Sequence, residues 1–201
     1  MILPNQLTVL RIILTPVFFI LFTAEDPLLK KISLLVYIIA AITDWYDGWL
    51  ARKFNYITDW GKFLDPLADK ILTSTAFAAF VLLGELELWM VLVIIFRDLF
   101  MTGLRLVADF KKKSFKTSIA AKIKTFVQMF FINYLILVHV LISDKNIYNY
   151  HPALFDALLN HDLLYYTMLS ITLYTLLTGI FYIQKNYKIV MELFKNETPK
   201  R

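Results

Sequence analysis

The stretch DWYDGWLARKFNYITDWGKFLDPLAD, residues 44–69, decides the fold, because it places four aspartates inside two otherwise apolar segments. Asp44, Asp47, Gly48 and Ala51 stand at positions i, i+3, i+4 and i+7. This spacing puts two carboxylates and two small residues on one face of a helix. Charges inside apolar helices are costly and usually functional, so this face is the first candidate site.

A second acidic face follows after a polar loop. Gly61, Asp65 and Asp69 stand at i, i+4 and i+8, again on one side of a helix. The glycine marks a level where another backbone or a ligand can approach closely. Residues one or two turns from a shared loop lie at similar depth in the two helices. We therefore expect the four carboxylates to meet.

Four ionised carboxylates at one place require compensation by protons or cations, because they repel strongly in a low dielectric. The chain has no cysteine, so a metal would be held by oxygen or by the three histidines. Two divalent ions, Mg²⁺ or Mn²⁺, would balance the charge, and such pairs commonly serve phosphoryl transfer. Alternatively, the aspartates cap helix ends or pair with the basic residues between 52 and 70.

The whole chain is as apolar as a membrane protein, with 59% hydrophobic residues among 201 and a mean hydropathy of +0.61. A span of the bilayer needs roughly 20 apolar residues. Runs of this length predict an all-α, polytopic membrane protein with six transmembrane helices, at about 6–24, 32–51, 63–83, 88–108, 123–142 and 163–183.

The basic residues indicate the orientation of these helices. Lysine and arginine concentrate in 51–62, 105–124 and the tail after 184, whereas the opposite loops hold few. The positive-inside rule then predicts cytoplasmic termini and an acidic site on the cytoplasmic side of the cell membrane. The net charge of +5 suits an anionic lipid surface, and we expect no nucleic-acid partner. The loop 143–162 is interpreted as an ordinary external connection.

The acidic stretch resembles the signature of the CDP-alcohol phosphatidyltransferase family, D-x-x-D-G-x-x-A-R, eight residues, then G-x-x-x-D-x-x-x-D. The chain reproduces it without a gap from Asp44 to Asp69. The resemblance implies one such domain over 1–201 and a reaction in which an alcohol attacks the β-phosphorus of CDP-diacylglycerol, releasing CMP. Family members are commonly homodimers, and the same is expected here.

The resemblance also assigns roles to residues. Asp44, Asp47 and Asp65 would be metal ligands, and Asp69 would coordinate or flank a metal and act as general base on the acceptor hydroxyl. The cytidine and diphosphate would contact Asn5, Thr8, Gly48, Ala51, Arg52 and Gly61. Small residues admit a nucleotide and an arginine suits a phosphate. Asn5 and Thr8 are equally consistent with capping of the first helix.

A second polar cluster predicts the acceptor. Arg97, Met101 and Arg105 share one helical face, and the next helix opens with Lys122 and Lys124. These cations at one depth predict an anion pocket. An acceptor that carries a phosphate explains such a pocket better than a free amino alcohol does.

The strings that hold these cations, R-[DE]-x-x-x-[ST]-G-L-R and G-K-x-K-T-x-x-Q, resemble the phosphatidylglycerophosphate synthase branch, whose acceptor is sn-glycerol 3-phosphate. Here Asp98 replaces the usual Glu, and Ala121 replaces the usual Gly. The expected phosphate contacts are Arg105 and Lys122, with direct or supporting roles for Arg97, Lys124, Thr125 and Gln128. For Arg97, a buried ion pair with Asp98 or with a carboxylate of another helix is equally expected.

Two alternatives remain open at this stage. Another branch of the family, such as the phosphatidylinositol phosphate synthases, would share the aspartates and use a different acceptor pocket. From a different class, a cation transporter could place acidic residues in helices, although it would not need small residues and an arginine at fixed offsets.

Overall fold

The computed structural model describes residues 3–54, 59–113, 115 and 119–194, and the side chains of residues 3–5, 51–52, 59–60, 62 and 194 lie outside this description. The regular structure within these residues is entirely helical. Six helices are long: α1 (Leu3–Thr23), α2 (Pro27–Phe54), α3 (Asp59–Leu82), α4 (Leu88–Phe110), α5 (Ile119–Ser143) and α8 (His161–Lys185). Each predicted transmembrane segment coincides with one of them to within a few residues, and the all-α fold class is confirmed.

Three segments of the described chain are long and apolar enough to cross a membrane by length and composition: Gln6–Thr23, Ile119–Ser143 and Pro152–Lys185. The other long helices, α2, α3 and α4, carry most of the acidic and basic residues singled out above. Six crossings therefore stay a prediction.

The loop 143–162 differs from the expected plain connection. It contains α6 (Lys145–Tyr150) and α7 (Pro152–Leu158), and a further short helix, α9 (Tyr187–Phe194), follows α8. The side chain of Asp144 accepts a hydrogen bond from the backbone N–H of Asn146 at 3.0 Å, and a proline opens α7. Both residues are typical helix starts, and their turn-like composition concealed the helices.

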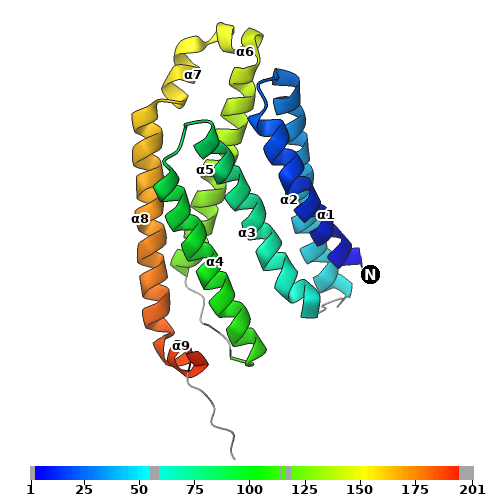
Figure 1. Cartoon of the computed structure of the whole chain (residues 1–201), viewed down its shortest axis with the longest axis vertical. Coiled ribbons are helices and arrows are strands. Elements are labelled where there is room, and N and C mark those ends of the chain that lie inside the picture. Colours follow the sequence, from blue (N-terminus) through cyan, green and yellow to red (C-terminus); the bar gives the residue numbers. More distant parts are fainter. Residues whose placement is uncertain (1–2, 55–58, 114, 116–118, 195–201) are drawn as a thin grey trace, which may run out of the picture.

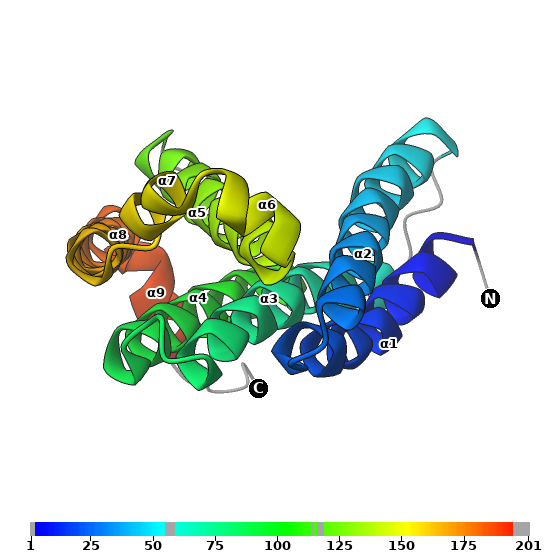
Figure 2. The same cartoon turned by 90° about the horizontal axis from the view of Figure 1, so that it is seen from above.

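The helices pack as two groups joined by α3 and α4. Figure 2 shows α1 and α2 on one side of the bundle and α5 to α8 on the other, with α3 and α4 along the lower edge of the view, and α2 also contacts α5. Helix α3 contacts α1, α4 and α5, and α8 contacts α4 and α5. Aromatic rings fill the core near the α1–α2 turn, where the ring of Phe22 lies 5.3 Å from Phe18 and 5.2 Å from Phe80.

The outer surface of the bundle is apolar. Large side chains that are more than 60% exposed include Ile20, Leu82, Phe96, Phe126, Phe130 and Phe181. Water would disfavour so much exposed hydrocarbon, whereas lipid accepts it. The protein is therefore a membrane protein.

The polar residues of interest gather at one end of this bundle. The start of α1, the end of α2, the start of α3, the end of α4 and the start of α5 all lie there, together with α9 (Figure 1). The short helices α6 and α7 lie at the opposite end. This arrangement brings residues that are far apart in the sequence to one level.

Candidate active site

The four aspartates lie on α2 and α3 at the end of the bundle described above. Asp44 is near enough to Asp65 and Asp69 for their charges to repel, and Asp47 is similarly near Asp44 and Asp65. Asp47 is almost fully buried, whereas the side chain of Asp44 is 47% exposed. The structure thus brings the predicted carboxylates onto facing sides of two helices.

Helix α1 closes the acidic site from a third side. The guanidinium of Arg11 lies 2.7 Å from Oδ1 of Asp44 and 2.8 Å from Oδ2 of Asp47, and its side chain is fully buried. The hydroxyl of Thr8 donates to Oδ1 of Asp65 at 2.6 Å. Thr8 was predicted as a site residue and Arg11 was not, although a lone cation in an apolar helix was a usable signal.

The other nucleotide-side residues are only partly described. Gly48 is half-buried in α2 and Gly61 is buried in α3. Asn5, Ala51 and Arg52 lie within α1 and α2, and their side chains fall outside the described part of the structure. The small residues therefore lie at the acidic end of the bundle, as their spacing requires.

The chemistry of this donor set fits a hard divalent cation, because carboxylate and hydroxyl oxygens converge from three helices. Among the described residues, no three acidic or histidine side chains are gathered closely enough to enclose an ion. Arg11 and Thr8 instead engage Asp44, Asp47 and Asp65. In this arrangement Arg11 compensates part of the negative charge of the site, and Thr8 adds a neutral hydrogen bond.

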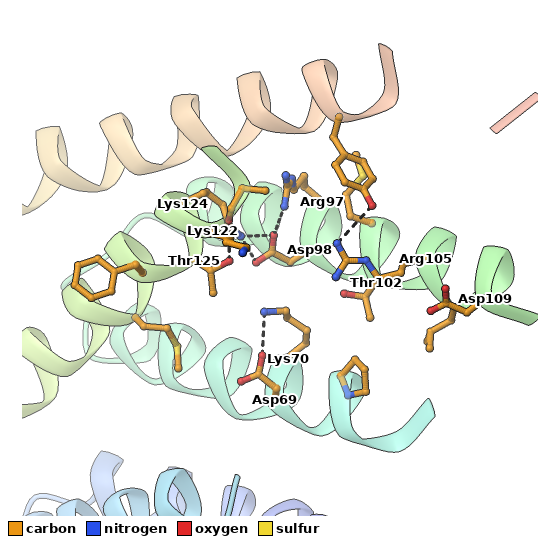
Figure 3. A pocket seen from close by; sticks show the side chains of 17 residues that line it. Asp69, Lys70, Arg97, Asp98, Thr102, Arg105, Asp109, Lys122, Lys124 and Thr125 are labelled. Atoms are coloured by element: carbon orange, nitrogen blue, oxygen red, sulfur yellow. Dashed lines mark hydrogen bonds and ion pairs between the residues drawn. The ribbon is translucent and has the colours of Figure 1, made fainter. Parts of the chain in front are cut away.

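A cavity of about 630 Å³ opens beside the acidic site, between α3, α4, α5 and α8. Figure 3 shows Asp69 and Lys70 on one side of it and the basic residues of α4 and α5 on the other. Its charged lining consists of five basic and three acidic side chains, a net charge of +2: Lys70, Arg97, Arg105, Lys122 and Lys124 against Asp69, Asp98 and Asp109. Asp69 therefore faces a space that attracts anions.

One buried carboxylate organises the basic wall of this cavity. Both oxygens of Asp98 accept hydrogen bonds from Nζ of Lys124, at 2.6 and 2.7 Å, and Oδ1 also accepts from Nη1 of Arg97 at 2.9 Å. Asp98 and Lys124 are each less than 5% exposed. The predicted pair of Arg97 with Asp98 is present, and Lys124 joins it.

Helix α8 supplies further contacts that the sequence did not reveal. Nη2 of Arg97 donates to the hydroxyl of Thr178 at 3.3 Å, and Nη2 of Arg105 donates to the hydroxyl of Tyr182 at 3.5 Å. A Cβ atom on Gly179 would lie 3.1 Å from Nε of Arg97, so the glycine lets the guanidinium approach the helix. The sequence predicts this segment only as a membrane crossing, although threonines and a tyrosine in an apolar helix are a weak polar signal.

The remaining predicted acceptor residues lie in different surroundings in the structure. Lys122 and Thr125 line the cavity, with Thr102 as an additional polar neighbour. Gln128 is buried in α5 outside the cavity lining. All the predicted acceptor residues except Gln128 thus line one cavity, and its binding of an anion stays a prediction.

Comparison with known proteins places the chain in a family. The sequence model of the CDP-alcohol phosphatidyltransferase family matches residues 1–159. The chain belongs to this family. The resemblance drawn from residues 44–69 is thereby confirmed, and the family is generally dependent on a divalent metal.

Individual members of the family agree on one activity. The chain is 39% identical over 135 residues to a CDP-diacylglycerol–glycerol-3-phosphate 3-phosphatidyltransferase of Rickettsia typhi, covering 67% of this chain and 76% of the relative. It is 40% identical over 147 residues to the protein of that name in Bacillus subtilis, with the same coverage. A probable phosphatidylglycerophosphate synthase of Mycobacterium tuberculosis is 38% identical over 129 residues, 63% of this chain and 61% of that protein.

Proposed function

We propose that the protein transfers the phosphatidyl group of CDP-diacylglycerol to sn-glycerol 3-phosphate, giving phosphatidylglycerophosphate and CMP. One observation carries the choice of acceptor: the cavity beside Asp69 has a net charge of +2, which matches a phosphate monoester dianion. The names of the relatives point to the same acceptor. The reaction belongs to phospholipid biosynthesis.

Asp69 is the proposed general base. It lies on α3 at the boundary between the acidic site and the cavity, within an ion pair with Lys70 at 3.0 Å. It accepts the proton of the acceptor hydroxyl while that oxygen forms a bond to the β-phosphorus of CDP-diacylglycerol. The bond between this phosphorus and the oxygen of CMP breaks, and CMP leaves with the electron pair.

The carboxylates of Asp44, Asp47 and Asp65, with Asp69 beside them, are the groups proposed to hold Mg²⁺ or Mn²⁺, and two ions are expected. When bound, such ions neutralise the diphosphate and stabilise charge on the departing CMP. The nucleotide would lie against the small residues and the polar end of α1, for which the candidates are Asn5, Thr8, Gly48, Ala51, Arg52 and Gly61.

The acceptor phosphate is assigned chiefly to Arg105 and Lys122. Both line the cavity and are exposed to it, whereas Arg97 and Lys124 are already bonded to Asp98. Arg97 and Lys124 contribute positive potential to the cavity while they stay bonded to Asp98. Thr125 can add a hydroxyl contact from the same wall, and Gln128 is left with a packing role behind it.

The proposed architecture is one domain over 1–201, crossing the cell membrane six times with both termini and the active site on the cytoplasmic side. The contacts of α8 with α4 and α5, and its contribution to the cavity, support including the part beyond residue 159. A homodimer is the expected assembly. Anionic lipid headgroups would meet the basic residues after α4.

The test is release of CMP by purified protein in detergent with CDP-diacylglycerol and Mg²⁺. Glycerol 3-phosphate, inositol 1-phosphate, serine and no acceptor are compared, with EDTA as control. Release that requires glycerol 3-phosphate and stops with EDTA is the expected result. Release with inositol 1-phosphate alone would keep the chemistry and overturn the acceptor, whereas no release with any acceptor would overturn the enzymatic function.

A further inference from the structure

Arg11 is the most unusually placed cation among the described residues. It belongs to α1, whose stretch Gln6–Thr23 is apolar enough to span a membrane, and its side chain is fully buried. An arginine in such surroundings needs anionic partners, because an uncompensated charge is costly in a low dielectric. Its two terminal nitrogens serve different carboxylates, Asp44 at 2.7 Å and Asp47 at 2.8 Å.

The two ion pairs of Arg11 differ in their access to solvent. Asp47 is 3% exposed, so its bond to Arg11 is enclosed on all sides. Asp44 is 47% exposed, so one of its oxygens can be reached by a solvated ion while Arg11 holds the carboxylate from within. The planar guanidinium can keep one carboxylate when it gives up the other, because each uses a separate nitrogen.

We infer that Arg11 is the resident counter-cation of the acidic site: it holds Asp44 and Asp47 together without metal, and a divalent ion must compete with it for Asp44. Asp47 remains the anchor of Arg11 throughout. Arg11 is thus a positioning residue that lowers the affinity of the site for metal and keeps α1 joined to α2 when no ion is bound. The inference rests on the proposed metal-dependent function and concerns binding alone.

The experiment measures Mn²⁺ binding without substrate, from the electron paramagnetic resonance signal of free Mn²⁺, for the full chain in detergent. Arg11→Gln removes the competing charge, and its Mn²⁺ affinity should be about tenfold tighter than that of the unaltered protein. Its melting temperature in EDTA should fall, and saturating Mn²⁺ should restore most of the difference. Activity is not needed for either readout.

A matched control comes from the same helix face. Thr15 is buried one turn beyond Arg11 and donates to the backbone oxygen of Arg11 at 2.8 Å. Thr15→Val alters the interior of α1 without removing charge from the site, so its Mn²⁺ affinity should equal that of the unaltered protein. Tighter binding in both variants would attribute the effect to loosening of α1 and would overturn the inference.

Mn²⁺ affinity of Arg11→Gln that is equal to or weaker than that of the unaltered protein also overturns it. If Arg11→Gln does not fold, Arg11→Lys is used. A single ammonium group holds the carboxylates less rigidly than a guanidinium does, so Mn²⁺ should still bind Asp44 more readily than in the unaltered protein. Unchanged or weaker Mn²⁺ binding by Arg11→Lys would likewise overturn the inference. A failure of glycerol 3-phosphate to support CMP release would overturn the proposed acceptor and leave the Mn²⁺ result intact.

Discussion

The acidic half of the site, on α1, α2 and α3, and the basic half, on α4, α5 and α8, are arranged in opposite ways. In the first, Arg11 is buried between two carboxylates; in the second, Asp98 is buried between two cations. In each half a single opposite charge allows like charges to lie close together in a low dielectric. Removing a central residue should therefore affect folding, whereas removing an outer residue should affect binding or chemistry.

Asp69 offers the largest effect, because it belongs to the acidic half and also faces the basic cavity. Asp69→Asn removes the proposed base while keeping the shape of the side chain. Turnover should fall by about 10³-fold, within the range that general-base catalysis contributes. Steady-state CMP release, together with the melting temperature, measures both consequences.

A neutral control for this prediction is Asp162→Asn, since Asp162 begins α8 at the other end of the bundle and is 87% exposed. It should retain activity. Retained turnover in Asp69→Asn would remove the general-base role and leave Asp69 with an electrostatic one.

Asp98→Asn tests the central position of the basic half. Lys124 would remain buried with one neutral partner in place of an ionised one, and breaking a buried ion pair costs about 3 kcal/mol or more. We expect a clear fall in melting temperature and a higher KM for glycerol 3-phosphate, because Arg97 and Lys124 lose their common anchor. Thermal unfolding in detergent measures the first effect and initial rates the second.

The comparison for that variant is Asp109→Asn on the same helix. Asp109 is exposed at the rim of the cavity, so the melting temperature of Asp109→Asn should equal that of the unaltered protein. An equal loss in the two variants would show that burial of Asp98 is not what stabilises the basic half.

Arg105→Ala tests an outer position of the basic half. The loss of a charge-assisted contact to the acceptor phosphate should raise the KM for glycerol 3-phosphate about 30-fold, since such bonds are worth roughly 1.5–3 kcal/mol. The KM for CDP-diacylglycerol should change much less. Lys188→Ala, which removes an exposed cation from α9, should leave both values unchanged, and equal increases for both substrates in Arg105→Ala would contradict the assignment.

Tyr182→Phe should have a smaller effect on the same property. Its hydroxyl accepts a long hydrogen bond of 3.5 Å from Arg105, which orients the guanidinium without contacting the acceptor. We expect a rise of about threefold in the KM for glycerol 3-phosphate with kcat unchanged, at the low end of what one hydrogen bond contributes. A change in kcat alone would argue for a different role of α8.

The sequence predicted the acidic half better than the basic half for a physical reason. Asp44, Asp47, Asp65 and Asp69 lie within 26 residues on two helices joined by one loop, so helical periodicity alone brings them to the same level. The six long helices were predictable because spanning length is a strong constraint. Arg11 was missed because its partners lie 33 and 36 residues away on another helix, a distance that periodicity does not bridge.

The basic half depends on packing between helices that are distant in the sequence. Thr178 and Tyr182 meet Arg97 and Arg105 across about 80 residues, and no spacing rule indicates that α8 lies beside α4. Gln128 shows the converse limit: its spacing from Lys124 is correct for a shared face, yet α5 lines the cavity with Thr125, Phe126 and Met129 and buries Gln128 elsewhere. The sequence specified the helices and their charges, and their depth and contacts required the structure.

A third ion pair lies outside the proposed membrane segments, unlike the pairs of the acidic and basic halves. Nζ of Lys31 donates to Oδ2 of Asp144 at 2.5 Å near the start of α6. This bond, helped by the backbone N–H of Asn146, holds the pKa of Asp144 below its usual range. Its stabilisation is therefore present above the unfolded pKa of about 3.9 and is lost as the pH falls through and below that value.

Asp144→Asn should lower the melting temperature only slightly at pH 7, because exposed ion pairs contribute little. The difference from the unaltered protein should shrink as the pH falls below the ordinary pKa of aspartate and through the lowered pKa of Asp144, where this carboxyl becomes protonated. Differential scanning fluorimetry at several pH values measures it. A loss as large as that of Asp98→Asn would mean that burial does not separate the strong pairs of this protein from the weak ones, and the contrast between its central and outer charges would no longer hold.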